Sequence, residues 1–215
     1  MSRILSVQVG AVALLGETAV RSGFVKVPVA GRVQVALLGM AGDAQEDMVL
    51  HGGPDKAVYG YAANHYAAWL ADFPEHAPLF TPGAFGENLT IDGLVEDDLR
   101  VGDVHRIGSA LLQVCQPRVP CYKFALRFQD NRMPRAMVRS GRSGWYYRVL
   151  EGGSILAGDT IDLTDRPHPE FAFTRLVQIV KYGRADPADI QSLASMDGVA
   201  TALRMMAQQT LGSGR

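Results

Sequence analysis

The sequence predicts an α+β protein, mostly β, with a barrel-like β domain over residues 1–165 followed by a small helical domain over residues 170–215. Up to residue 165, many short apolar segments are separated by glycine turns, which is typical of a β-barrel. Beyond Arg166–Pro169 the apolar spacing becomes helical and capping residues appear. Since domains usually run to roughly 100 to 200 residues, a chain of 215 residues is long enough for this arrangement.

Short strands are expected throughout the first domain. In Ile4–Val9 the residues Ser6 and Gln8 alternate with apolar Leu5, Val7 and Val9, which indicates a strand with one buried face. The other expected strands are Val25–Val29, Val33–Leu38, Ala57–Tyr61, Leu89–Ile91, Gly144–Val149 and Thr160–Leu163. Val101–Val104 is expected to be a strand with a tight turn, and the apolar run Ile107–Cys115 that follows contains the strand Ala110–Cys115.

Two short helices are expected between these strands. In Asn64–Phe73 the apolar residues fall at i, i+3, i+4 and i+7, and Pro74 ends the pattern. That spacing places Tyr66, Trp69, Leu70 and Phe73 on one face. Pro134–Arg139 predicts one or two helical turns, because proline is favoured early in a helix and Gly141 follows at the carboxyl end.

The last part of the chain predicts further helices. Asp186 precedes Pro187, the combination of N-cap and first helical residue that begins many helices. Asp197 is expected to cap another helix carrying Val199, Leu203 and Met206.

The candidate site lies in the loop Gln116–Lys123. Pro117 and Pro120 have fixed φ angles and lack an amide hydrogen, so they hold Cys121 in a rigid irregular segment. Arg118 and Lys123 lie close to the sulfur, and nearby positive charge favours the thiolate. The loop alone allows a nucleophile, a redox sensor or a metal ligand. Cys115 ends an apolar strand and is expected to be a small buried hydrophobe.

Positive charge is concentrated around this loop, although the net charge of the chain is −1. Between Gln116 and Arg148 there are eight arginines and lysines and one acidic residue, Asp130. These cations alternate with proline, glycine and aromatic residues, so we expect a field that binds a small anionic ligand rather than polymeric nucleic acid. The alternative is a solvated charged face.

Several classes of protein are excluded because the sequence lacks their motifs. The sequence has no phosphate-binding lysine loop, dinucleotide fingerprint, zincin motif or hydrolase elbow, and its five histidines show no zinc spacing. The apolar stretch from Ile4 to Leu15 is too short to span a membrane and has the wrong flanks for a signal peptide. Two cysteines form no disulfide framework, so we expect a cytoplasmic protein.

Two turns could contribute ligand contacts. His51 precedes two glycines and Pro54, where backbone amides can approach a ligand closely, or it is a simple turn histidine. Asn88, in Gly86–Leu89, either donates its amide to a ligand or closes an Asx turn.

Six short segments follow one another along the chain: Gly42-Asp43, His51–Val58, Phe85–Thr90, Gly102-Asp103, Gln116–Lys123 and Gly141–Tyr146. In this order they resemble the MOSC family, named after the C-terminal domain of molybdenum-cofactor sulfurase. The combination with C-terminal helices resembles its YiiM-type branch, in which a three-helix domain follows the MOSC domain.

The resemblance implies a barrel-like domain that binds molybdenum cofactor, with Cys121 as the thiolate ligand of molybdenum. It further implies cofactor contacts from Arg21, Ser22, Lys26, His51, Asn88 and Arg118. Members of the branch reduce N-hydroxylated compounds, including hydroxylaminopurine-type base analogues, hydroxylamines and amidoximes, to amines. The sequence has no haem, Fe–S or flavin motif, so electrons are expected from a separate reductase. A cofactor carrier and a thiol or sulfur transferase using Cys121 are the alternatives.

Overall fold

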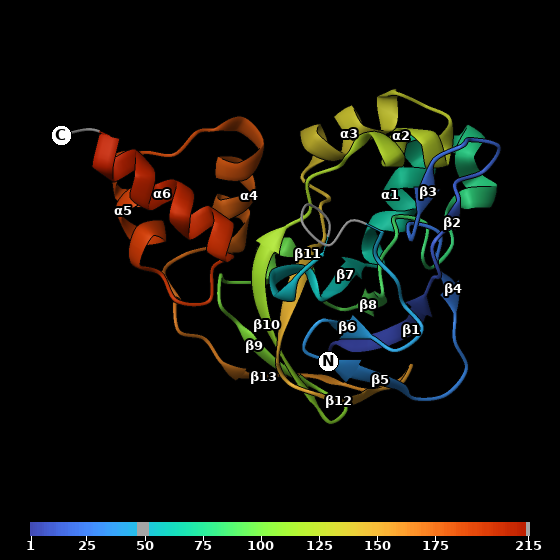
Figure 1. Cartoon of the computed structure of the whole chain (residues 1–215), viewed down its shortest axis with the longest axis horizontal. Coiled ribbons are helices and arrows are strands. Elements are labelled where there is room, and N and C mark those ends of the chain that lie inside the picture. Colours follow the sequence, from blue (N-terminus) through green and yellow to red (C-terminus); the bar gives the residue numbers. More distant parts are fainter. Residues whose placement is uncertain (47–51, 214–215) are drawn as a thin grey trace.

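A strongly curled eight-stranded sheet forms the centre of the protein in the computed structural model, which describes residues 1–46 and 52–213 (Figure 1). Neighbouring strands in this sheet follow the order β13-β9-β10-β11-β7-β8-β1-β4. Their bounds are β1 Arg3–Val9, β4 Val27–Pro28, β7 Val58–Ala62, β8 Leu89–Asp92, β9 Val104–Ile107, β10 Ala110–Pro117, β11 Trp145–Glu151 and β13 Ile161–Asp165.

Smaller elements complete the first 165 residues. Two further sheets are formed by β12 Gly153–Ile155, β5 Val33–Ala36 and β6 Gly39–Met40, and by β2 Ala13–Leu14 and β3 Arg21–Ser22. The helices are α1 Asn64–Asp72, α2 Tyr122–Phe128 and α3 Arg132–Ser140, with 3₁₀ turns η1 Pro54–Lys56, η2 Pro74–Leu79 and η3 Glu96–Asp98. The α+β class is confirmed, and strands predominate over helices within these 165 residues.

The two ends of the large sheet approach each other. Arg3 of β1 forms an antiparallel bridge with Thr160, next to β13. The Ile4 amide donates to the Asp159 carbonyl at 2.9 Å, and the Gly158 amide donates to the Ile4 carbonyl at 2.8 Å. This short contact makes the sheet barrel-like without closing it fully.

The strand predicted at Ala110–Cys115 is present as β10, and the apolar run that begins at Ile107 includes the turn before it. Gly108 adopts a φ of +56°, a conformation that favours glycine, and turns the chain between β9 and β10. At Val101–Val104 the predicted tight turn is formed by Val101 and Gly102, and the strand, β9, begins only at Val104. Helix α2 was not predicted.

The predicted helix at Asn64–Phe73 is present as α1, but its buried face is narrower than expected. Trp69 and Phe73 are buried, whereas Leu70 is 46% exposed. The predicted turns at Pro134–Arg139 belong to α3, which ends at Gly141 with a φ of +81°.

Three helices follow the sheet: α4 Phe173–Tyr182, α5 Pro187–Ser195 and α6 Thr201–Ser213. Figure 1 shows them together at one side of the molecule, orange to red, beside β10. Leu176 and Val177 of α4 belong to the same buried cluster as the sheet residues Leu112 and Val114. The division of the chain after residue 165 stays a prediction.

The caps of these helices agree only in part with the sequence. Asp186 caps α5 as predicted, since its carboxylate accepts the Asp189 amide at 2.8 Å. The expected cap Asp197 is wrong, because α6 begins four residues later, at Thr201, and Val199 precedes the helix. No helix among residues 1–46 and 52–213 is long and apolar enough to cross a membrane.

Candidate functional site

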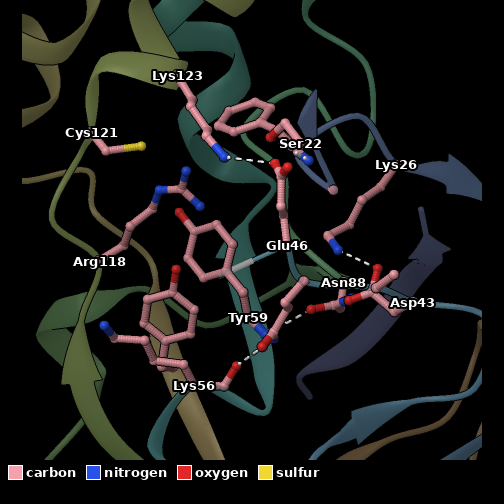
Figure 2. Close-up of a pocket in the computed structure, with 16 residues that line it drawn as sticks. Ser22, Lys26, Asp43, Glu46, Lys56, Tyr59, Asn88, Arg118, Cys121 and Lys123 are labelled. Atoms are coloured by element: carbon pink, nitrogen blue, oxygen red, sulfur yellow. Dashed lines mark hydrogen bonds and ion pairs between the residues drawn. The ribbon is translucent and has the colours of Figure 1, made fainter. Parts of the chain in front are cut away.

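The candidate site is a pocket of about 600 Å³, partly open to solvent, to which segments far apart in the sequence contribute (Figure 2). Its wall contains four cationic side chains and two carboxylates. The cations are Lys26, Lys56, Arg118 and Lys123, and the acids are Asp43 and Glu46. Positive charge therefore predominates, and the pocket suits an anionic ligand.

Arg118 is buried, with only 8% of its surface exposed. Its guanidinium carbon lies 5.1 Å from the ring centroid of Phe24 and 4.9 Å from that of Tyr59. Its Nε is buried and has no hydrogen-bond partner within the described part of the chain. A buried polar atom without a partner is costly, so a ligand oxygen accepting from Arg118 would stabilise the site.

Cys121 lies close to Arg118, because Pro117 ends β10 and the short loop that follows leads directly into α2. The half-buried Cys121 is the N-cap residue of α2, in extended conformation, and its sulfur lies on the same side of the pocket as the Arg118 guanidinium (Figure 2). The pocket can therefore bring a thiol and a cation to one ligand.

Lys26 and Asp43 form a buried ion pair on another part of the pocket wall. Burial lowers the pKa of Lys26, although the neighbouring Asp43 carboxylate acts in the opposite direction. Asp43 also accepts the Gly10 amide at 2.9 Å and the Asn88 side-chain amide at 2.9 Å. The Asn88 Oδ1 accepts the Tyr59 amide at 3.0 Å, so Asn88 ties three parts of the wall together.

A second ion pair involves Lys123. Its Nζ donates to the Arg21 carbonyl at 3.0 Å and lies 3.3 Å from a Glu46 carboxylate oxygen. Lys26 and Lys123 thus both have carboxylate partners within the pocket wall.

The aromatic side chains Tyr59 and Tyr146 lie in the wall, where Tyr59 is buried and Tyr146 half-buried. Burial raises the pKa of both hydroxyls, although Arg118 nearby acts to lower it. Both tyrosines therefore stay neutral and serve as hydrogen-bonding or apolar surface, not as anions.

The pocket brings together five of the seven predicted site residues: Ser22, Lys26, Asn88, Arg118 and Cys121. Arg21 is not among the lining residues, and its side chain points to the surface, 3.7 Å from Glu46. His51 lies outside the described residues.

The lining residues that were not predicted as ligand contacts include Asp43, Glu46, Lys56, Tyr59 and Tyr146. Asp43 and Lys56 belong to segments that carried the family resemblance, which could have suggested them. Nothing in the local pattern distinguishes Tyr59 from the other strand residues. Cys115, by contrast, is fully buried as expected, and burial raises the pKa of its thiol.

The cations between Gln116 and Arg148 do not form one field, as was expected from the sequence. Only Arg118 and Lys123 of that segment line the pocket. Arg142 lies 2.7 Å from Asp72, and Arg148 pairs with Asp55, so the chain folds these charges onto separate acidic partners.

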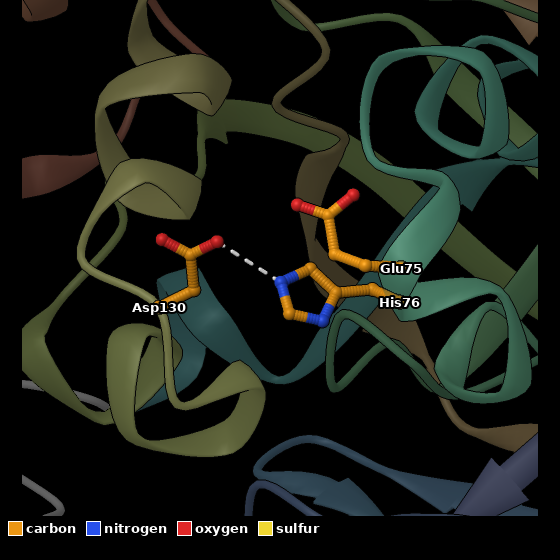
Figure 3. A group of neighbouring side chains, drawn as sticks. All are labelled: Glu75, His76 and Asp130. Atoms are coloured by element: carbon orange, nitrogen blue, oxygen red, sulfur yellow. Dashed lines mark hydrogen bonds and ion pairs between the residues drawn. The ribbon is translucent and has the colours of Figure 1, made fainter.

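A cluster of Glu75, His76 and Asp130 offers three metal-ligating side chains elsewhere on the protein (Figure 3). His76 Nε2 lies 3.0 Å from Asp130. The Arg132 guanidinium donates to Asp130 at 2.6 Å and to Glu75 at 2.5 Å, and it holds the pKa of Asp130 well below its usual range. The two carboxylates are therefore neutralised by arginine, and the cluster is an ion-pair network.

Comparison with known proteins defines the class to which this fold and pocket belong. The sequence profile of the MOSC domain matches residues 47–162, more than half of the chain. The chain therefore belongs to the MOSC domain family, a family of molybdenum-cofactor-binding domains.

Within that family the chain is of the YiiM type. It is 42% identical over 145 residues to Protein YiiM of Escherichia coli K12, which covers 67% of this chain and 65% of that protein. It is 36% identical over 152 residues to a protein of Gibberella moniliformis named Reductase, covering 70% of this chain and 27% of that protein. These alignments span less than two thirds of the length of each relative.

Solved structures extend the similarity to nearly the whole chain. The crystal structure of YiiM from Geobacillus stearothermophilus superimposes with a TM-score of 0.81 at 33% identity, over 97% of this chain and 98% of that one. YiiM from Escherichia coli gives a TM-score of 0.82 at 31% identity, over 100% of this chain and 94% of that one.

Proposed function

We propose that this protein is a molybdenum-cofactor-dependent oxidoreductase that reduces N-hydroxylated compounds, such as hydroxylaminopurine-type base analogues, hydroxylamines and amidoximes, to amines. Membership of the MOSC family supports the cofactor, and the relative named Reductase supports the class of reaction. The observation that carries the proposal is the pairing of a half-buried thiol, Cys121, with a buried arginine whose Nε has no partner in the described structure.

The residues of the pocket fit this cofactor. Its phosphate is anionic, and the pocket wall carries more cations than carboxylates. Cys121 would provide the thiolate ligand, and the Nε of Arg118 would donate to an oxygen of the bound group. The guanidinium lies over the rings of Phe24 and Tyr59, and its planar array of donors suits recognition of an oxyanion.

When bound, the cofactor supplies a two-electron redox centre able to accept an oxygen atom. The net reaction consumes two electrons and two protons, breaks the N–O bond and releases water. The chain has only two cysteines, of which Cys115 is fully buried, so we assign electron supply to a separate reductase. Phe24, Tyr59 and Tyr146 would exclude water around the reacting group.

Purification from a host that makes molybdenum cofactor tests the proposal. We expect equimolar molybdenum and reduction of 6-hydroxylaminopurine with a supplied electron donor. Cys121→Ala is expected to lose metal and activity while keeping its folded circular dichroism spectrum. Cys115→Ala is the matched control and is expected to keep both, because Cys115 faces the interior.

Two other outcomes would contradict the reductase assignment. Bound molybdenum without reduction of any N-hydroxylated compound would indicate a cofactor carrier. Wild-type protein without molybdenum, but with a persulfide on Cys121 after incubation with a sulfur donor, would indicate a sulfur transferase.

A further inference from the structure

A carboxylate next to the pocket caps a helix of the C-terminal region. The Asp55 Oδ2 accepts the amide of Thr201, the first residue of α6, at 2.7 Å, across 146 residues of sequence. Its Oδ1 accepts Arg148 Nε at 2.7 Å, so the charge of Asp55 is balanced within the same contact. The side chain is half-buried between the sheet and the helix.

Helix α6 has no cap of its own. The residue before it is Ala200, whose side chain cannot accept a hydrogen bond. The Asp197 side chain is 94% exposed and pairs weakly with Arg204 at 3.5 Å. Since the first amides of a helix lack intrahelical partners and carry partial positive charge, Asp55 supplies the acceptor that α6 itself lacks.

The segment that carries Asp55 also forms part of the pocket. Lys56, the next residue, lines the pocket, and its carbonyl accepts the Gln45 side-chain amide at 3.1 Å from a neighbouring part of the wall. The Asp55 carbonyl accepts the Gln116 side-chain amide at 2.9 Å. Gln116 lies two residues before Arg118, so contacts of Asp55 reach both the Lys56 side and the Arg118 side of the pocket.

The end of the C-terminal region is fixed to the same strands. The Ala200 amide donates to the Cys115 carbonyl at 3.0 Å, and an Arg148 nitrogen donates to the Val199 carbonyl at 3.3 Å. The start of α6 is therefore held against β10 and β11, and it presents its first amide to Asp55.

We propose that Asp55 is a positioning residue through which the N-terminus of α6 holds the Pro54–Lys56 edge of the pocket in place. The C-terminal helices are then part of the support of the pocket. The inference rests on the proposed function in one respect only: it assumes that this pocket is where the ligand binds.

Thr201→Pro isolates the contact. Proline is tolerated at the first position of a helix and has neither the amide hydrogen nor the hydroxyl of Thr201, so the variant removes the contacts of Thr201 with Asp55 and leaves Asp55 in place. We expect amide hydrogen exchange over residues 52–57 to become about tenfold faster, because the segment loses a hydrogen bond to a charged group. Acetylation of Lys56, followed by mass spectrometry, is expected to become faster as well.

Asp186→Ala is the matched control, because it removes the cap of α5 within the same group of helices. It is expected to lower the melting temperature as Thr201→Pro does, and to leave exchange over residues 52–57 unchanged. Unchanged exchange there in Thr201→Pro would overturn the inference. An equal acceleration in Asp186→Ala would also overturn it, because loosening of any C-terminal helix would then suffice.

Asp55→Asn gives a reciprocal measurement should the proline variant fold poorly. The asparagine side-chain oxygen still accepts the Thr201 amide, but it carries no negative charge and the hydrogen bond is weaker. Amide hydrogen exchange over residues 201–205 should therefore become faster, by less than the tenfold expected for residues 52–57 in Thr201→Pro. No acceleration there would contradict the inference. These measurements need neither cofactor nor substrate, so their failure is distinct from a failure of the reductase assignment.

Discussion

The Lys26 ammonium and the Asp43 carboxylate form an ion pair in the wall of the pocket, with 7% and 3% of their side-chain surfaces exposed. Removing one member of such a pair leaves a buried charge without its partner, which is more harmful than replacing both. The pair therefore serves two purposes: it holds the wall together, and it places a cation beside the ligand.

Lys26→Met is expected to lower the free energy of unfolding by about 3 kcal/mol, because Asp43 would keep its charge in a buried site. The double variant Lys26→Met/Asp43→Asn should recover part of this loss. Urea denaturation of the three proteins measures the effect. A double variant as unstable as the single one would show that the pair does not govern the stability of the wall.

Arg118→Lys is expected to lose most of its bound molybdenum on dialysis, although it keeps the positive charge. Lysine has neither a planar group to lie over the rings of Phe24 and Tyr59 nor an Nε donor. Arg142→Lys is the matched control, since Arg142 also lies over a ring, that of Trp69 at 5.1 Å, but pairs with Asp72 away from the pocket. Equal molybdenum loss in both variants would contradict a specific role for Arg118.

Acid is expected to destabilise the protein through His105. Burial, assisted by Arg166, lowers the pKa of His105 to about 4, while Asp103 acts in the opposite direction. Because this value lies below that of an unfolded histidine, about 6.5, the unfolded state binds the proton first and stability falls as the pH drops from about 6.5 to about 4. The total loss is roughly 3 kcal/mol.

Urea denaturation of wild type and His105→Gln across that range checks the prediction. Glutamine does not titrate, so the variant should show a shallower dependence on pH. Parallel curves for the two proteins would assign the acid sensitivity to other groups.

Glu87→Gln is expected to destabilise the Gly83–Glu87 turn by about 2 kcal/mol. The buried Glu87 carboxylate accepts the Gly83 amide at 2.8 Å, the Phe85 amide at 3.1 Å and the Thr90 hydroxyl at 3.0 Å. An amide group in its place turns one acceptor into a donor and leaves at least one of these groups unpaired. Thermal unfolding measures the change, and a melting temperature equal to that of wild type would contradict this role.

The sequence was sufficient for the elements whose signals are local. The Asp186-Pro187 pair identified the start of α5 because a cap and a first-turn proline act within a few residues. It was insufficient for α6, whose capping carboxylate comes from Asp55, 146 residues away. No local pattern can reveal an acceptor supplied by tertiary structure.

The pocket was predictable to a similar degree. Arg118 and Cys121 are close in sequence, so their proximity was expected from the loop itself. Lys56, Tyr59 and Tyr146 reach the pocket only because β7 lies beside β11 in the sheet. The prediction of one positive field after Gln116 was wrong, because Arg142 and Arg148 pair with acidic residues that are distant in sequence, Asp72 and Asp55.

The contact between Ile4 and Asp159 has a consequence for synthesis on the ribosome. The first strand emerges early, and β4 pairs with its last residues, but Asp159, which pairs with Ile4, is translated more than 150 residues later. Until then, the beginning of this edge of β1 exposes backbone groups that could pair with other chains. Nascent chains stalled before residue 158 should therefore depend on chaperones more than longer nascent chains, in which Gly158 and Asp159 have left the ribosome and can pair with Ile4.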